Sequence, residues 1–293
     1  MTDYKDRAPL VTEASLLLAV LFLGTNPVAV KYAVGQIPPL PFVALRFTLA
    51  GLLLLGLARI LSPKSLPNRR DLVSMAWVGL VGVGMNNVAF TLGVSMTTAS
   101  ETALIYAAVP IWGMLLGAFL GLERPTRGGV FGVLVAIAGV CVVVGGGFGG
   151  GSSLLGNLLV VVATACWGSY AVLSLSLLRK YSPLVVASLT MLFAGLGVAP
   201  VALLGLWNTD WGAVGAGAWA SLVYSTVLVA AFGFWAWQRG ISGVGANRAL
   251  VYQYLITLVG VVSGVLLLGE GLTANKVLGG AVILIGVYLA RRR

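Results

Sequence analysis

Apolar stretches of about 20 residues follow one another along this chain, separated only by short polar or glycine-rich segments. A helix needs about 20 apolar residues to cross the hydrocarbon core of a bilayer. Ten such stretches end at charged, glycine or proline residues: 12–34, 40–61, 72–95, 99–121, 128–147, 154–178, 183–205, 213–237, 246–268 and 274–290. The sequence therefore predicts an all-α polytopic membrane protein with ten transmembrane helices and no soluble catalytic domain.

The composition supports this fold class and excludes several functions. Charged residues make up 9% of the chain, against roughly 25% in a soluble domain. The chain has no histidine, and Cys141 and Cys166 both lie in apolar runs. These facts argue against histidine chemistry, a zinc site and a disulfide framework. No nucleophile with a neighbouring base lies within the helices, so we expect no enzyme activity, no metal and no cofactor.

Basic residues occupy every predicted loop on one side of the membrane, whereas Lys31 and Lys276 alone fall on the other side. Positive charges beside membrane helices are retained on the cytoplasmic side. The net charge of +10 therefore reports membrane topology rather than a nucleic-acid partner. We expect a multi-pass protein of the cell inner (plasma) membrane, with the lipid bilayer as its partner and both termini in the cytoplasm.

The two halves of the chain repeat each other. An offset of 147 residues pairs Gly113 with Gly260 and Glu123 with Glu270, and an offset of 144 pairs Gly24 with Gly168. The repeats are predicted at 1–147 and 154–293, with a glycine-rich linker over 145–153. Each repeat holds five helices, and an odd number forces the second copy to enter the membrane from the opposite side. Inverted repeats place a substrate site near the bilayer midplane, which predicts a transporter.

The repeated motif resembles a known family. Pro110 to Gly139 reads P-x-x-G-x-x-x-G-x-x-x-G-x-E-x-P-T and then G-x-x-x-x-x-x-G, and a second copy runs from Gly260 to Gly286. These segments, with Leu45-Arg46-Phe47 and Trp167-Gly168-Ser169-Tyr170, resemble the EamA family of the drug/metabolite transporter superfamily. The resemblance implies a ten-helix carrier that moves small organic metabolites, often amino acids, outward.

Within that family, the chain length and the Trp167 region are most similar to the aromatic amino acid exporters. Val109 stands before Pro110, where close relatives of those exporters are expected to carry a bulky aromatic residue. This departure favours a broader range of amino acids, so both aromatic and other neutral amino acids are expected as substrates.

Polar residues inside the predicted helices are candidates for the site. Pro27 frees a backbone carbonyl that can bind a substrate ammonium or water. The alternative is an ordinary helix kink in which Thr25 compensates for the lost hydrogen bond. Asn86 and Asn87 are costly to bury, so at least one is expected to face a polar cavity or another helix, and Asn86 is favoured.

Aromatic residues with a few polar tips complete the predicted lining, and Trp167 is the strongest single candidate. Such a lining suits a small zwitterion with an apolar side chain, whereas packing and lipid contact are the alternative roles. The predicted substrate-binding residues are Thr25, Asn26, Met85, Asn86, Phe90, Tyr106, Trp167, Tyr170, Tyr224, Phe232, Tyr252 and Gln253.

Three charged residues within the predicted helices, Arg46, Glu101 and Arg248, are candidates for a functional role. Arg46 falls about 9 Å inside the outer end of its helix, where it could snorkel to the headgroups, cap a neighbouring helix or meet a substrate carboxylate. Glu101 and Arg248 occupy matching positions of the two repeats and are predicted to be interfacial, as polar parts of gates on opposite sides.

No Asp, Glu, Lys or His falls near the middle of a predicted helix, so we expect transport without obligatory ion coupling. Other small organic metabolites, cationic drugs and a passive channel or structural role remain as alternatives. The small-residue faces of 128–147 and 274–290 could pack within one chain or between two, which leaves a monomer or a weak homodimer.

Overall fold

The computed structural model describes residues 3–61, 67–121, 127–145, 153–244 and 246–291. Side chains are described within these ranges except at 3–12, 244, 246–251 and 290–291. The predicted linker lies mostly outside the described residues, as does Glu123, and so does the side chain of Arg248. Every regular element in the described part is helical.

Within the described residues, ten helical segments cross the molecule, five from each half of the chain. The first five are α1 (Asp3–Val34), α2 (Pro39–Leu61), α3 (Arg69–Gly79) continued by η1 (Leu80–Met85) and α4 (Asn86–Met96), α5 (Ala99–Tyr106) continued by α6 (Val109–Phe119), and α7 (Arg127–Gly145). The second five are α8 (Leu154–Leu178), α9 (Pro183–Asn208), α10 (Ala216–Tyr224) continued by η2 (Ser225–Gly233) and α11 (Phe234–Val244), α12 (Ala246–Leu268), and α13 (Ala274–Arg291).

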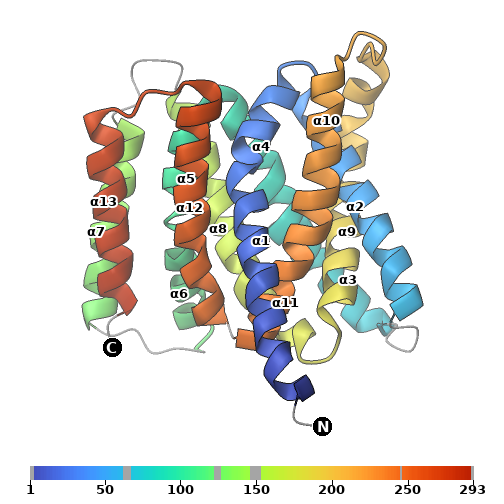
Figure 1. The fold of residues 1–293 in the computed structure, drawn as a ribbon, viewed down its shortest axis with the longest axis horizontal. Helices are drawn as coiled ribbons and strands as arrows, with labels where there is room; N and C mark the ends of the chain where they lie inside the picture. The colour runs from blue at the N-terminus through green and yellow to red at the C-terminus, as the bar shows by residue number, and fades with distance from the viewer. Residues whose placement is uncertain (1–2, 62–66, 122–126, 146–152, 245, 292–293) are drawn as a thin grey trace.

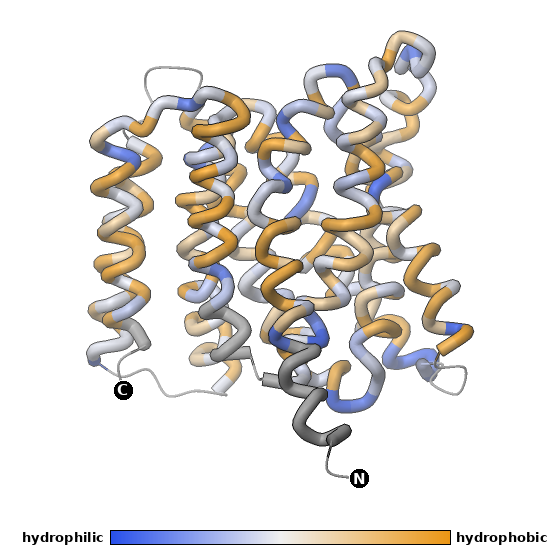
Figure 2. The backbone as a smooth tube through the Cα atoms, viewed as in Figure 1, coloured by the Kyte–Doolittle hydropathy of each residue, from blue (hydrophilic) through white to orange (hydrophobic). Residues whose placement is uncertain are grey.

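Eight of these segments are long and apolar enough to span a membrane, and two shorter apolar helices, Tyr252–Leu268 and Ala274–Leu289, complete the set of ten among the described residues. The predicted ten-helix fold class is therefore confirmed. Side chains on the outside of the bundle are apolar: Trp207, Phe119 and Leu204 are 90%, 86% and 78% exposed. Figure 2 shows hydrophobic residues along the spans and hydrophilic segments concentrated at the two ends.

The segments run alternately up and down, so that α1 begins and α13 ends at the same end of the bundle (Figure 1). We call this end the terminal end and the opposite one the distal end. The connections at 35–38, 97–98, 209–215 and 269–273 lie at the distal end. The first helix of the second half, α8, starts at the distal end, whereas α1 starts at the terminal end. The two halves therefore cross the membrane in opposite directions.

Matched glycines bring the two halves together at two equivalent contacts. A Cβ atom on Gly24 of α1 would lie 2.6 Å from Val259 Cβ of α12, and one on Gly168 of α8 would lie 2.6 Å from the Val109 carbonyl of α6. Real Cβ atoms do not approach this closely, so both contacts require glycine. The first helix of each half thus packs against the fourth span of the other half.

The small-residue faces of α7 and α13 pack on each other within the chain. A Cβ on Gly139 would lie 2.6 Å from Ile283 N, and one on Gly279 would lie 2.9 Å from the Gly139 carbonyl. The second helices of the two halves meet in the same way, because a Cβ on Gly51 of α2 would lie 2.6 Å from Leu192 N of α9. The intramolecular alternative for these glycine faces is the one observed.

The third span of each half contains a π-helical segment, η1 in the first half and η2 in the second. A π-helix bonds residue i to i+5 and therefore takes more residues per turn than an α-helix. Side chains after such a segment are rotated relative to those before it. This rotation decides which residues of α4 and α11 face the centre of the bundle.

Candidate functional site

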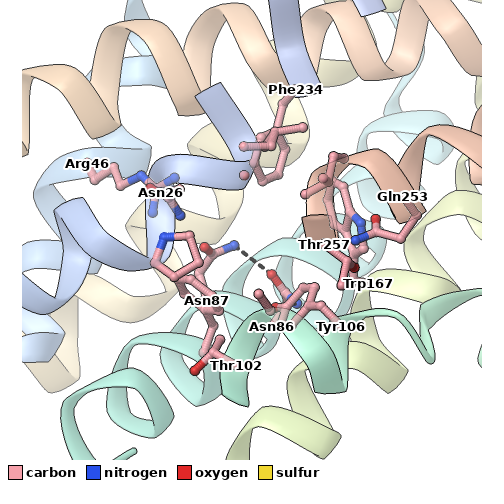
Figure 3. Close-up of a pocket in the computed structure, with 16 residues that line it drawn as sticks. Asn26, Arg46, Asn86, Asn87, Thr102, Tyr106, Trp167, Phe234, Gln253 and Thr257 are labelled. Carbon is pink, nitrogen blue, oxygen red and sulfur yellow. Dashed lines mark hydrogen bonds between the residues drawn. The ribbon is translucent and has the colours of Figure 1, made fainter. Parts of the chain in front are cut away.

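A cavity of about 60 Å³ lies between the two halves of the chain (Figure 3). A water molecule needs roughly 10–15 Å³ of such space, so the cavity can hold several waters in the conformation that the structure shows. It is lined by residues of α1 (Leu23, Gly24, Asn26, Pro27), α2 (Arg46), α4 (Asn86, Asn87, Phe90), α5 (Thr102, Ala103, Tyr106), α8 (Trp167), α11 (Phe234) and α12 (Gln253, Ile256, Thr257).

Helix α1 contributes Pro27 to the cavity lining, and the helix continues beyond this proline to Val34. Pro27 has no N–H, so the carbonyl of Leu23, four residues earlier, loses its usual helical donor. Thr25 does not enter the cavity lining: its hydroxyl lies 2.8 Å from the Leu21 carbonyl and also bonds to the Tyr224 hydroxyl. Thr25 and Tyr224 thus join α1 to α10 outside the cavity.

Two asparagines at the start of α4 form a fixed polar wall. Asn86 Nδ2 donates to Tyr106 OH at 2.9 Å and to the Ala163 carbonyl at 2.7 Å. Asn87 Nδ2 donates to Asn86 Oδ1 at 2.9 Å, the bond drawn in Figure 3, and to the Val83 carbonyl at 3.0 Å. Both amide groups are therefore held in one orientation while they line the cavity.

An aromatic wall centres on Trp167. Its ring lies 4.8 Å from the ring of Phe234, edge to face, and is stacked on Tyr170 at 5.4 Å between centroids. Tyr170 is fully buried behind Trp167, where its hydroxyl accepts from Gln238 Nε2 at 2.8 Å and lies 3.0 Å from Thr190 Oγ1. Tyr170 therefore supports the wall instead of lining the cavity.

The structure brings together half of the sequence-predicted site residues. The cavity lining includes Asn26, Asn86, Phe90, Tyr106, Trp167 and Gln253. It does not include Thr25, Met85, Tyr170, Tyr224, Phe232 or Tyr252. Met85 is 54% exposed, and the structure does not bring it into this cavity.

Helix phase explains the misplaced aromatic residues of the eighth span. Tyr224 and Phe232 would share one face of a regular α-helix, because they are eight residues apart. Phe232 lies within the π-helical segment η2, which changes the helical phase of this span. Phe234, the first residue of α11, therefore lines the cavity, whereas Phe232 packs against Phe22 at 5.8 Å. Tyr252 is half-buried against the hydrophobic core.

Several lining residues were not among those predicted from the sequence. Thr257 follows the predicted Gln253 by four residues on α12, so helical spacing alone could have indicated it. Thr102 and Ala103 line the cavity next to Tyr106 at one turn's distance. Phe234 carried no such signal, because its position depends on the π-helical segment.

Arg46 is fully buried and reaches the cavity, so it does not snorkel to the headgroups. Its Nε donates to the carbonyl of Ser225, the first residue of η2, at 2.9 Å. Its guanidinium carbon lies 4.9 Å from the Phe47 ring centroid. Within the described residues Nη1 has no hydrogen-bond partner. Arg46 thus satisfies a carbonyl of η2 and leaves a donor unused.

A buried polar network joins the two halves of the chain at the distal end. Lys276 Nζ lies 3.4 Å from Glu101 Oε1 and donates to Thr98 Oγ1 at 3.2 Å. The Glu270 carboxylate accepts from the backbone N–H groups of Ala99 and Ser100 at 2.7 and 2.8 Å, where it caps α5. These contacts tie residues of the second half to the start of α5 in the first half.

Comparisons with known proteins agree with this architecture. The EamA-like transporter family matches residues 11–145 and 154–292. An uncharacterized transporter of Archaeoglobus fulgidus is 28% identical over 283 residues, which cover 95% of this chain and 98% of that protein. A probable terminal-alkyne amino-acid exporter of Streptantibioticus cattleyicolor is 30% identical over 228 residues, which cover 78% of this chain and 75% of that protein. A solved crystal structure shares the fold, with a TM-score of 0.68, 21% identity and 96% coverage of both chains.

Proposed function

The chain belongs to the EamA-like transporter family, and from that premise we propose that it exports aromatic and other neutral amino acids across the cell inner membrane. The observation that carries this proposal is the lining of the cavity between the repeats. It combines amide, hydroxyl and guanidinium groups with the rings of Phe90, Tyr106, Trp167 and Phe234. Such a lining matches a small zwitterion with an apolar side chain. The similarity to a probable amino-acid exporter supports the same substrate class.

Alternating access fits the arrangement of the two halves. Inverted repeats can adopt two related conformations that open to opposite sides around one central site. The network of Glu101, Glu270 and Lys276 joins the two halves at the distal end. In the proposed cycle this network breaks when the cavity opens to the distal side.

Transport in this proposal is driven by the substrate gradient alone. No Asp, Glu, Lys or His is among the described residues that line the cavity. Proton-coupled carriers commonly keep such a residue at the centre of the membrane. The described basic residues Arg59, Arg69, Arg127 and Arg179 lie at helix ends of the terminal side, which supports cytoplasmic termini.

Uptake into proteoliposomes tests the proposed function. The purified chain would be reconstituted without ion gradients and supplied with labelled phenylalanine, tryptophan, methionine, threonine or lysine, each competed by the unlabelled compound. We expect saturable, competed uptake of the neutral amino acids. Lysine should be a poorer substrate, because the described lining holds no carboxylate for its second ammonium group.

Three other results would contradict parts of the proposal. Uptake that requires an imposed pH gradient and disappears with an ionophore would show ion coupling. Flux that does not saturate would indicate a passive channel. No uptake of any of the five amino acids, with or without gradients, would move the substrate to another class of organic metabolite or to cationic drugs.

A further inference from the structure

Buried polar atoms without partners face each other across the cavity. In the described part of the chain, Arg46 Nη1, Gln253 Oε1 and Thr257 Oγ1 line the cavity and make no hydrogen bond. Figure 3 shows Arg46 beside Asn26 on one side, and Gln253 with Thr257 on the opposite side. Buried polar groups in proteins are nearly always paired. Three unpaired polar atoms around one cavity therefore indicate that a bound ligand supplies their hydrogen-bond partners.

The side with Arg46 suits an anionic group. Arg46 carries a positive charge, and no acidic side chain is among the described residues lining the cavity. A buried charge without a counter-ion is costly in a membrane, and a carboxylate would remove that cost. A guanidinium can donate two parallel hydrogen bonds to a carboxylate. One edge of Arg46 is held by Ser225, so the group is already oriented.

Asn26 supplies a second donor on this side. Ser225 Oγ donates to Asn26 Oδ1 at 3.3 Å, so the Asn26 carbonyl is occupied. No described residue accepts a hydrogen bond from Asn26 Nδ2, although the side chain is buried and lines the cavity. Ser225 therefore orients both Arg46 and Asn26, and both present donors to the same side of the cavity.

The opposite side suits a cation with N–H donors. Gln253 and Thr257 lie one turn apart on α12, which places both on one face of the helix. Each has a buried oxygen without a donor among the described residues. Trp167 lies next to them in Figure 3, and an aromatic face attracts an ammonium group. This side therefore offers acceptors where the Arg46 side offers donors.

We propose that Arg46 binds the carboxylate of the transported amino acid, with Asn26 as the second donor, while Gln253 and Thr257 accept hydrogen bonds from its ammonium group. The inference rests on the proposed function and adds the orientation of the substrate within the cavity. The apolar side chain of the substrate then lies against the aromatic wall around Trp167.

Analogues of one substrate test this orientation with the unmodified protein. Uptake of labelled phenylalanine would be competed by phenylalanine, by phenylalaninamide, which lacks the carboxylate, and by 3-phenylpropionate, which lacks the ammonium. A hydrogen bond to a charged group corresponds to about 10- to 100-fold in affinity, so each analogue should compete about 10- to 100-fold more weakly. A parallel set with methionine and methioninamide covers a preference for unbranched side chains.

Single substitutions test which residue binds the carboxylate of the substrate and which binds its ammonium group. Arg46→Gln should weaken competition by phenylalanine about 10- to 100-fold and leave phenylalaninamide unchanged, so the discrimination between them disappears. Arg46→Lys keeps the charge and should retain part of that discrimination. Gln253→Leu should reduce the discrimination against 3-phenylpropionate instead. Arg59→Gln removes an exposed arginine from the same helix and serves as the matched control.

Two results would overturn the inference while leaving the proposed function intact. One is equal competition by phenylalanine and phenylalaninamide on the unmodified protein, which needs no variant to fold. The other is an Arg46→Gln protein that still prefers the free carboxylate. By contrast, if the unmodified protein takes up none of the labelled amino acids, the proposed function itself fails.

Discussion

Lys276 Nζ lies 3.4 Å from Glu101 Oε1, and this ion pair joins α13 of the second half to α5 of the first. Both side chains are almost fully buried, with 8% and 2% of their surface exposed. Thr97 Oγ1 donates to the other carboxylate oxygen of Glu101 at 2.8 Å. The contact between the two repeats at the distal end is therefore electrostatic and shielded from water.

Removing one partner of this pair should cost more than removing both. Glu101→Gln or Lys276→Met alone leaves a buried group unpaired, which typically costs about 3–5 kcal/mol, whereas the double variant should lose less than either. The measurement is the thermal unfolding midpoint in detergent. Strictly additive losses in the double variant would show that the two side chains do not stabilise each other.

The Glu270 carboxylate should act as a cap for α5. Its two oxygens accept from Ala99 N and Ser100 N, so Glu270→Ala leaves two helix N–H groups without these acceptors. We expect a loss of about 1–2 kcal/mol, and a smaller loss for Glu270→Gln, which keeps one carbonyl acceptor. Differential scanning fluorimetry measures the unfolding midpoints and checks that Glu270→Ala lowers the midpoint more than Glu270→Gln does. Glu13→Ala, at an exposed acidic residue of α1, is the control. Equal midpoints for Glu270→Ala and Glu13→Ala would refute the capping role.

Gly24 should not tolerate even a methyl group. Its Cβ would lie 2.6 Å from Val259 Cβ and 2.9 Å from the Ile256 carbonyl, so Gly24→Ala must push α1 away from α12. We expect a loss of about 1–3 kcal/mol from overpacking, together with slower transport. Gly56→Ala is the matched control, because nothing lies within 4 Å of its Cβ position in α2. That change should stabilise by about 0.5–1 kcal/mol through helix propensity. Thermal midpoints that rank the two variants the other way would contradict the packing described here.

Trp167 should determine affinity for substrates with apolar side chains. Trp167→Ala removes the central ring of the aromatic wall, and Trp167→Phe keeps an aromatic face. We expect the half-saturation concentration for phenylalanine to rise about tenfold in Trp167→Ala, since an aromatic contact is worth roughly 0.5–1.5 kcal/mol beyond its area. Trp207→Ala, at a 90% exposed residue, should leave this concentration unchanged. The saturation curve of labelled phenylalanine uptake measures both. Unchanged half-saturation in Trp167→Ala would remove this residue from the site.

The fold could be predicted from the sequence because its determinants are local or repeated. The length of each apolar run decides whether a segment spans the membrane, and an odd number of spans per repeat decides that the second repeat is inverted. The pairing of Gly24 with Gly168 in the sequence reappears as two equivalent helix contacts. Polar residues within apolar runs, such as Asn26 and Asn86, stood out for the same reason.

The residues that line the cavity could be predicted from the sequence only in part. Sequence spacing assumes 3.6 residues per turn, and the π-helical segments η1 and η2 break that assumption in the third span of each half. For this reason Phe232 was placed in the cavity and Phe234 was missed.

By itself, the sequence determined the ten apolar spans, the inverted repeat and the family, because each of these follows from residue order along the chain. Only the tertiary structure decided that Lys276 pairs with Glu101, and that Arg46 donates to the Ser225 carbonyl while its Nη1 has no hydrogen-bond partner in the described part of the chain. The partners in each pair are about 175–180 residues apart. Their meeting depends on how spans from opposite halves pack, and a one-dimensional pattern does not contain that information.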